Sequence, residues 1–268
     1  MVKVVTEDDE QYLRKRNYWR LVGKLQYLVN TRPDIAYAVG KLARFASKPR
    51  KIHWEAAQQL LGYLRGSQDM RITYVRRDNG IGIKPERLEP ECYADADFGG
   101  DKETRRSTTG IMIKLSGGVV VASSKRQTTV ADSTTAAETI ALHSLVKEAL
   151  WVRNMLVWTG YELPRPTVLL CDNNVTVRNS GEGQERSRTK HMDIKYMFIR
   201  DAVRRELIVV KHIGTKDMVA DPLTKGMGWI LFGGHLERMG LMKGSVRNNE
   251  SSAQAEIEAG GKNRSRQR

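Results

Sequence analysis

Three short strand-like segments follow one another between residues 91 and 124, and a long helical pattern comes after them. The segments span 91–98, 110–115 and 118–124, and only a tight Ser116-Gly117-Gly118 turn separates the last two. Strands in such close succession predict an antiparallel meander. This arrangement excludes an all-helical bundle and requires the following elements to complete a sheet.

The remaining pattern predicts two more strands joined by helices. Apolar residues recur on one face of a helix from about Ser133 to Thr159. An apolar run without alternation is typical of a central strand that is covered on both faces. We therefore predict an α/β fold with a mixed five-stranded sheet and flanking helices. The elements expected after the long helix are a strand at 167–172, a short helix from Asn173, a helix at 192–206, a strand at 207–213 and a final helix near Asp217.

A linker separates this region from a smaller, mainly helical segment. Apolar residues recur at helical spacing after Pro33 and again from Trp54 to Gly66, and a short extended piece is expected at 73–75. Two glycines and two prolines mark the linker. The predicted organisation is a helical segment at 1–77, a linker at 78–90, an α/β domain at 91–230 and a C-terminal extension at 231–268 that is disordered from about residue 245.

Positive charge is concentrated at the front of the chain. The net charge is +14, and residues 1–90 hold 18 Lys and Arg against 10 Asp and Glu, whereas residues 91–230 hold 20 against 17. Such an excess favours a polyanionic partner such as nucleic acid, although many basic proteins bind none.

Cysteine and apolar content exclude several classes of protein. Two cysteines, Cys92 and Cys171, cannot build a disulfide scaffold or a four-cysteine zinc site. No apolar run reaches the ~18 residues of a membrane-spanning helix, and the N-terminus lacks a signal-peptide core. We expect an intracellular protein, cytoplasmic or nuclear, with no membrane partner.

Carboxylates occupy the ends of the predicted elements. Asp95 lies in the first strand and Asp172 ends the buried strand, and the predicted topology makes these strands parallel neighbours. Glu138 lies in the first turns of the long helix, and Asp221 opens the expected last helix. Close carboxylates repel each other unless a cation lies between them, and Mg²⁺ suits a site made of oxygen ligands.

Each of these residues also has an ordinary structural interpretation. An Asp at the end of a strand often caps a turn or helix, and Asp221 before Pro222 matches a helix N-cap. Glu138 could be an exposed residue that interacts with the helix dipole. Asp97 and Asp101 are expected to be surface or loop carboxylates. The periodicity alone does not bring the four candidates together.

A series of sequence blocks runs along the chain in a specific order and spacing. The blocks are WRLVGKLQYLVNTRPDIAYAVGKLARFASKP (19–49), HWEAAQQLLGYLRGSQD (53–69), YADADFGGD (93–101), RRSTTG (105–110), SSKRQTTVADSTTAAETIAL (123–142), KEALWVR (147–153), LLCDNN (169–174), RSRTKHMDIKY (186–196) and VADPLTK (219–225). The blocks from residue 93 onward resemble the ribonuclease H domain of copia-type retrotransposon polyproteins, and the first two look like the thumb and connection region at the end of that family's reverse transcriptase. The resemblance covers roughly residues 11–230.

This resemblance implies that Asp95, Glu138, Asp172 and Asp221 are catalytic and hold metal. It also implies hydrolysis of the RNA strand of RNA–DNA hybrids with two Mg²⁺ ions, for which Mn²⁺ can substitute. His212, nine residues before Asp221, is a candidate for proton transfer or product release, although a lone strand His is more often structural. The family's polymerase motif is absent upstream, so we expect no DNA synthesis.

Several side chains are candidates for contact with the hybrid or for a purely structural role. Cys92 and Cys171 have strand parity opposite to the aspartates, which predicts inert thiols facing the core. Each basic candidate could equally be a solvated surface charge. The candidates for binding nucleic acid are Lys125, Arg126, Arg186, Arg188, Lys190 and His191.

Some residues depart from the family pattern and put local packing and substrate contact in question. Phe98 stands where the family usually shows Trp, Asp132 replaces an apolar residue, and Ala136 and Thr139 replace Glu and Tyr. One alternative is therefore a degenerate or domesticated remnant that binds nucleic acid without cutting it. Another is a strand-transfer enzyme of the integrase type, although such enzymes carry other motif blocks and need just three carboxylates.

Overall fold

The computed structural model describes residues 6–13, 16–75, 89–161, 163, 165–181 and 190–244. The predicted linker falls almost entirely outside these ranges, as does the predicted disordered tail. The helices are α1 (Glu7–Leu13), α2 (Tyr18–Leu28), η1 (Pro33–Ile35), α3 (Ala36–Ala43), α4 (Lys51–Gly66), α5 (Thr134–Trp158), α6 (Asn174–Ser180), α7 (Lys190–Arg204), η3 (Thr215–Asp217), η4 (Asp221–Leu223) and α8 (Trp229–Arg238), and the strands are β1 (Met70–Ile72), β2 (Glu91–Asp97), β3 (Thr108–Leu115), β4 (Gly118–Arg126), β5 (Thr167–Cys171), β6 (Ile208–His212) and β7 (Leu241–Lys243).

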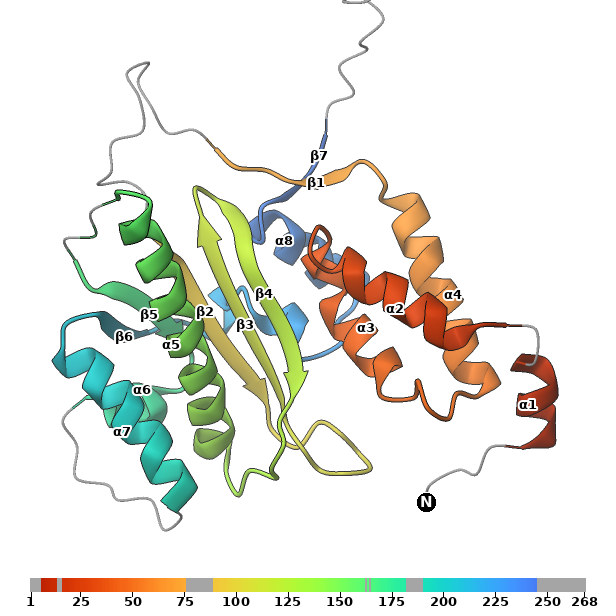
Figure 1. Ribbon diagram of the computed structural model, residues 1–268, viewed down its shortest axis with the longest axis horizontal. Helices are drawn as coiled ribbons and strands as arrows, with labels where there is room; N and C mark the ends of the chain where they lie inside the picture. Colours follow the sequence, from red (N-terminus) through yellow and green to blue (C-terminus); the bar gives the residue numbers. More distant parts are fainter. Residues whose placement is uncertain are drawn as a thin grey trace, which may run out of the picture.

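A five-stranded sheet in the order β4-β3-β2-β5-β6 forms the centre of the molecule (Figure 1). β2, β3 and β4 are antiparallel neighbours, whereas β5 runs parallel to both β2 and β6. Ser116 and Gly117 adopt positive φ angles of 50° and 84°, which suits the tight turn between β3 and β4. The predicted mixed five-stranded sheet, its antiparallel meander and the parallel pairing of the first strand with the fourth are confirmed.

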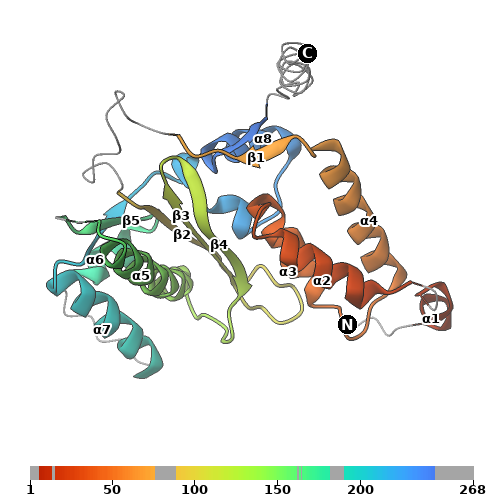
Figure 2. The same cartoon turned by 45° about the horizontal axis from the view of Figure 1, so that its top comes forward.

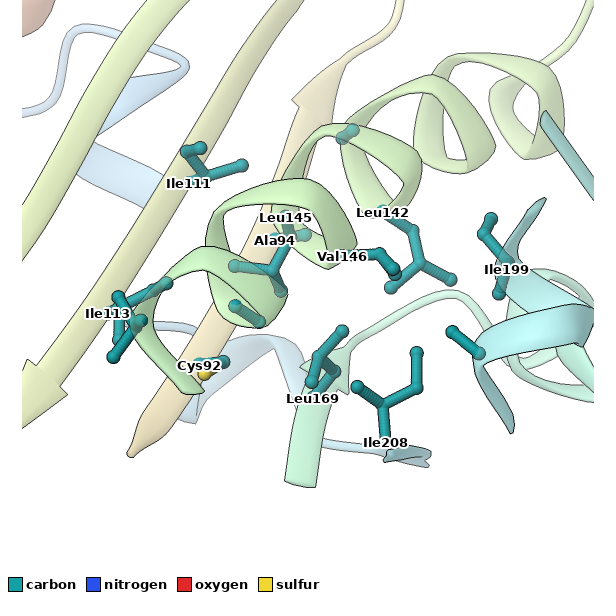
Figure 3. Close-up of a cluster of buried hydrophobic side chains, with 14 of the residues drawn as sticks. Cys92, Ala94, Ile111, Ile113, Leu142, Leu145, Val146, Leu169, Ile199 and Ile208 are labelled. Atoms are coloured by element: carbon teal, nitrogen blue, oxygen red, sulfur yellow. The ribbon is translucent and has the colours of Figure 1, made fainter. Parts of the chain in front are cut away.

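One face of the sheet is covered by α5 and α7. Side chains of β2 and β3, among them Cys92 and Ile113, point toward Leu142, Leu145 and Val146 of α5 (Figure 3). α5 begins cleanly because the Ser133 hydroxyl accepts a hydrogen bond from the Ala136 amide at 3.1 Å. The buried apolar face of this long helix fixes its position across the sheet.

The opposite face is covered by the C-terminal elements, which the sequence pattern did not reveal. The prediction of a final helix near Asp217 was wrong, because that region forms the short 3₁₀ turns η3 and η4. Helix α8 and strand β7 follow, and Leu236, Met239 and Leu241 pack with Met112 of β3 in a second buried cluster. The first three residues of α8, Trp229, Ile230 and Leu231, are apolar but largely exposed. The sequence pattern of this helix is therefore not clearly amphipathic.

The N-terminal helices form a separate layer beside β4, which we call the helical module (residues 16–75) (Figure 2). Two attachments join it to the sheet. β1 pairs with β7, with Arg71 opposite Met242. β1 lies three residues before the extended piece expected at 73–75, so the predicted position of this strand was wrong by three residues. The second attachment is Asp101, whose Oδ2 pairs with Arg44, the residue directly after α3, at 2.8 Å and with Arg126 of β4 at 2.9 Å.

The expectation that Asp97 and Asp101 are surface or loop carboxylates was right only for Asp101, which lies in the loop between β2 and β3, whereas Asp97 belongs to β2. Asp101 is buried, and the backbone amides of Glu103 and Thr104 also donate to its Oδ1, which helps hold its pKa well below the usual range despite the opposing effect of burial. Asp97 is half-buried and accepts a hydrogen bond from the Thr108 amide. Among the described residues, no helix is long and apolar enough to cross a membrane.

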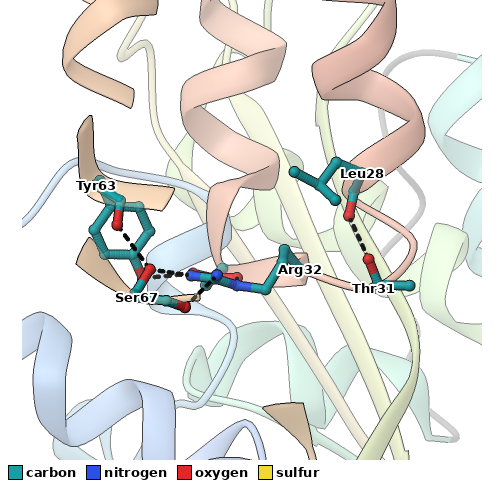
Figure 4. A network of polar contacts seen from close by, with 6 residues as sticks. Leu28, Thr31, Arg32, Tyr63 and Ser67 are labelled. Carbon is teal, nitrogen blue, oxygen red and sulfur yellow. Dashed lines mark hydrogen bonds and ion pairs between the residues drawn. The ribbon is translucent and has the colours of Figure 1, made fainter. Parts of the chain in front are cut away.

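A buried ion pair holds the helical module together. The Arg32 guanidinium donates to both carboxylate oxygens of Asp34 at 3.0 and 2.8 Å, and to the backbone carbonyl and hydroxyl of Ser67 at 2.8 Å each (Figure 4). The Tyr63 hydroxyl donates to the same carboxylate. This network links the start of α3 to the end of α4, where apolar contacts alone do not define the orientation.

Replacing Arg32 by Ala leaves the buried Asp34 carboxylate without its cation. We expect the Arg32→Ala variant to lose about 3–5 kcal/mol in free energy of unfolding, measured by chemical denaturation. The matched control is Lys51→Ala, because the Lys51–Glu55 pair is long (3.9 Å) and exposed. Its loss should stay below about 0.5 kcal/mol. Equal losses in the two variants would contradict the role of the buried pair.

Candidate active site

Asp95 and Asp172 lie side by side because their strands are parallel neighbours. Ala94 of β2 is paired with Cys171 of β5, so the next residue of each strand reaches the same end of the sheet. Asp95 is only 5% exposed, whereas Asp172 is half-buried at the first residue beyond β5. This is the end of parallel strands at which α/β sheets place ligands. The predicted juxtaposition of the two aspartates is present.

Glu138 reaches the same place from α5. It lies in the second turn of the helix and is 6% exposed. Its Oε1 accepts a hydrogen bond from the Ala96 amide of β2 at 3.3 Å. Ligand atoms of Glu138, Cys171 and Asp172 all lie within 4.8 Å of one another. An exposed position for Glu138 is therefore excluded.

Asp221 comes from η4, on the face of the sheet opposite α5, and is 8% exposed. Pro222 fixes the backbone at the first position of this short turn. Lys225, four residues on, places its Nζ 2.9 Å from Asp221 Oδ1. The turn can lie close to the sheet because Gly110 of β3 has no side chain: a Cβ there would lie 2.6 Å from the Thr224 methyl carbon and 2.9 Å from the Leu223 Cβ.

The electrostatics show a group of carboxylates held together by the fold. Burial raises the pKa of Asp95 to about 6, helped by Asp221 and Asp172 and opposed by a hydrogen bond from the Thr224 hydroxyl. Burial, then Asp95 and Asp172, raise the pKa of Glu138 to about 9. The pKa of Lys225 is raised as well. Burial lowers this pKa, but the nearby carboxylates, Asp221 foremost, raise it by a larger amount. An added cation would relieve this repulsion.

The donor set fits a hard divalent cation such as Mg²⁺. Carboxylate oxygens are ligands that Mg²⁺ prefers. The raised pKa values of Asp95 and Glu138 show that negative charge is crowded there, and only the ammonium group of Lys225 and bound protons offset it. Asp95, Glu138, Asp172 and Asp221 would hold the metal. The ligand roles themselves remain predictions.

Sequence reasoning missed three residues that support these carboxylates. Thr224 donates a hydrogen bond from its hydroxyl to Asp95 Oδ2, and the Thr215 hydroxyl donates to Asp172 Oδ2 at 3.0 Å. Lys225 pairs with Asp221 as described above. The spacing of three and four residues from Asp221 to Thr224 and Lys225 was the available signal, because such residues share one side of a helical turn.

His212 lies at the exposed edge of the site. Its Nε2 is 3.1 Å from the Asp172 backbone carbonyl oxygen, an arrangement in which the ring nitrogen donates. The imidazole therefore contacts the backbone of Asp172, a predicted metal ligand, and remains accessible to solvent. A catalytic role for His212 remains a prediction.

The candidate nucleic-acid contacts are only partly described. Lys125 is exposed, whereas the Arg126 guanidinium pairs with Asp101. Arg186 and Arg188 lie outside the described residues, and for Lys190 and His191 only the backbone, at the start of α7, is described. Contact with nucleic acid remains a prediction for all of these residues.

The prediction that both cysteines face the core is confirmed. Cys92 belongs to the core beneath α5, and burial raises its pKa to about 12. Cys171 is also fully buried, and burial raises its pKa well above the usual range. Its Sγ lies 3.9 Å from Glu138 Oε2, because Glu138 projects from α5 onto the same side of β5, so this buried thiol also borders the carboxylates.

The raised Glu138 pKa predicts a pH-dependent stability in the presence of a chelator. Between about pH 5 and 9 the folded protein keeps a proton that the unfolded chain has released, so stability falls as pH rises through this window. Glu138→Gln does not titrate. We expect its Tm at pH 8.5 to exceed that of wild type by about 2–4 °C, the shift produced by about 1 kcal/mol in a chain of this size. The two Tm values should converge near pH 5, and a constant difference would contradict this assignment.

Comparison with known proteins places this arrangement in a family. No protein-family model matches the chain. The N-terminal RNase H domain of a Mycobacterium tuberculosis protein covers 51% of the chain and 91% of that structure at 14% identity and a TM-score of 0.39. A foamy viral protease-reverse transcriptase solved with double-stranded DNA covers 78% and 35% at 10% identity and a TM-score of 0.46. At such low identity these likenesses concern the fold alone.

The curated relatives are much more similar in sequence. The Pol polyprotein from transposon TNT 1-94 of Nicotiana tabacum is 38% identical over 82% of this chain and 16% of its own length. That from transposon RE2 of Arabidopsis thaliana is 34% identical over 84% of this chain and 15% of its own length. The chain thus spans less than a fifth of the polyproteins that it matches. This chain carries the mixed five-stranded sheet, and it belongs to the retrovirus-related Pol polyproteins of copia-type transposons.

Proposed function

We propose that this chain is a divalent-metal-dependent ribonuclease of the ribonuclease H type that cuts the RNA strand of RNA–DNA hybrids as part of a Pol polyprotein. The observation that carries the proposal is the electrostatic coupling of Asp95 with Glu138, Asp172 and Asp221, which come from separate segments, together with the close approach of the Glu138 and Asp172 ligand atoms. The membership in the Pol family supports it independently.

Bound Mg²⁺ would supply an activated water and would stabilise the charge that develops on the leaving 3′-oxygen. Asp95, Glu138, Asp172 and Asp221 would hold the metal, and Asp95 interacts electrostatically with each of the other three. His212 at the solvent edge can exchange a proton with the departing product. Products would carry 5′-phosphate and 3′-hydroxyl ends.

Removing one carboxylate separates cleavage from binding. We expect Asp95→Asn to reduce Mg²⁺-dependent cleavage of a labelled RNA–DNA hybrid by more than about 100-fold, because a metal ligand is lost from the reacting centre. Binding of the hybrid in a gel-shift assay should remain. The comparison uses the whole chain in Mg²⁺ and in chelator.

Two results would contradict the enzymatic assignment. Wild type that binds the hybrid but cleaves it no faster than Asp95→Asn would favour a remnant that binds nucleic acid without cutting it. Alternatively, cleavage that persists in chelator would exclude the metal mechanism.

The helical module offers a surface for the nucleic acid beyond the active site. It holds 11 Lys and Arg against 3 Asp and Glu in residues 16–75. The outer face of α2 presents Trp19, 73% exposed, and Tyr27, 80% exposed, with exposed Arg20 and Lys24 on the same helix. Aromatic rings beside cations suit contact with bases or sugars next to phosphates.

This surface predicts a salt-dependent affinity for the hybrid. The double variant Arg20→Gln/Lys24→Gln should lower the slope of log K against log salt by about 2, because each phosphate contact contributes about 0.9 through counterion release. Lys147→Gln, an exposed position on α5, is the matched control and should leave the slope unchanged. The measurement is fluorescence anisotropy at several salt concentrations. An unchanged slope in the double variant would contradict contact through α2.

A further inference from the structure

We propose that Thr224 is a positioning residue of the active site: its hydroxyl fixes the carboxylate of Asp95 and ties β2 to the turn that carries Asp221. This inference rests on the proposed metal site. Thr224 follows η4 directly and its exposure is 0%. It does not belong to the four carboxylates, so it would act through them.

The hydroxyl has two acceptors from two different elements. It donates to Asp95 Oδ2, and its oxygen also lies 3.0 Å from the backbone carbonyl oxygen of Asp221. A hydroxyl has one proton and donates to one acceptor at a time. Asp95 Oδ2 has two lone pairs, so it can accept this hydrogen bond and still ligate a cation. The arrangement is therefore compatible with both the empty and the loaded site.

The methyl group of Thr224 holds the hydroxyl in place. Its Cγ2 lies against Gly110, where a Cβ would come within 2.6 Å of it. Gly110 is the residue of β3 directly opposite Asp95 in the register of the two strands. The side chain is thus packed against the sheet beside the carboxylate that it serves, and its β-branched χ1 has little freedom.

Positioning of this kind acts on metal affinity. A carboxylate that ligates a cation must present its oxygens in a fixed orientation, and residues that hydrogen-bond to ligands typically contribute 10–100-fold to affinity or activity. Asp95 interacts electrostatically with each of the other three carboxylates, so a change in its orientation affects the whole site.

The test uses the whole chain and compares two variants, each of which removes a different part of the Thr224 side chain. Thr224→Val keeps the branched shape and removes the hydroxyl, whereas Thr224→Ser keeps the hydroxyl and removes the methyl group. Mg²⁺ affinity is measured by isothermal titration calorimetry without nucleic acid. We expect Val to weaken Mg²⁺ binding by at least about 10-fold and Ser by less than about 3-fold. In hybrid cleavage, Val should lower kcat with little change in KM, and Ser should restore most of kcat.

Equal Mg²⁺ affinity of wild type and a folded Val variant would overturn the inference. So would a loss in Ser as large as in Val, since packing of the methyl group would then explain both. If near-ultraviolet circular dichroism shows that the Thr224→Val variant does not fold, Thr224→Cys takes its place. Its thiol is close in size to the hydroxyl but is a weak hydrogen-bond donor. Should wild type bind Mg²⁺ but cut no hybrid, the proposed function fails while the titrations still decide the role of Thr224.

Discussion

Four carboxylates lie close together at one end of the sheet, and three of them are almost fully buried. Like charges that lie close together in a medium of low dielectric destabilise a fold. The packing of the surrounding structure must therefore keep these carboxylates together. The parallel pairing of β2 with β5 sets Asp95 beside Asp172, the capped start of α5 delivers Glu138, and Gly110 lets the Asp221 turn lie on the sheet. The ammonium group of Lys225 offsets only part of the charge.

The helical module depends on the same sheet. α3 is attached through Arg44 to Asp101, which also binds Arg126 at the end of β4, and β1 pairs with β7 beyond the active-site turn. These contacts come from segments far apart in the chain, so the module and the carboxylates have a defined relation.

Much of this was predictable from the sequence, because strand and helix periodicity is local. The meander, the long helix, the two parallel strands and the pairing of Asp95 with Asp172 follow from pattern and topology rules. The C-terminal elements α8 and β7 did not, since β7 is short and depends on a partner more than 160 residues away. The burial of Asp101 and the position of Cys171 depend on tertiary contacts that no local pattern contains.

The most direct test of the central claim is to locate divalent cations in crystals of the chain. Anomalous diffraction from crystals grown or soaked with Mn²⁺ in place of Mg²⁺ would show whether metal binds among the carboxylates. The account predicts anomalous density in contact with Asp95 and with at least one of Glu138, Asp172 and Asp221, lost in the Asp95→Asn variant. Absence of metal density there at saturating Mn²⁺, with the carboxylates ordered, would contradict it.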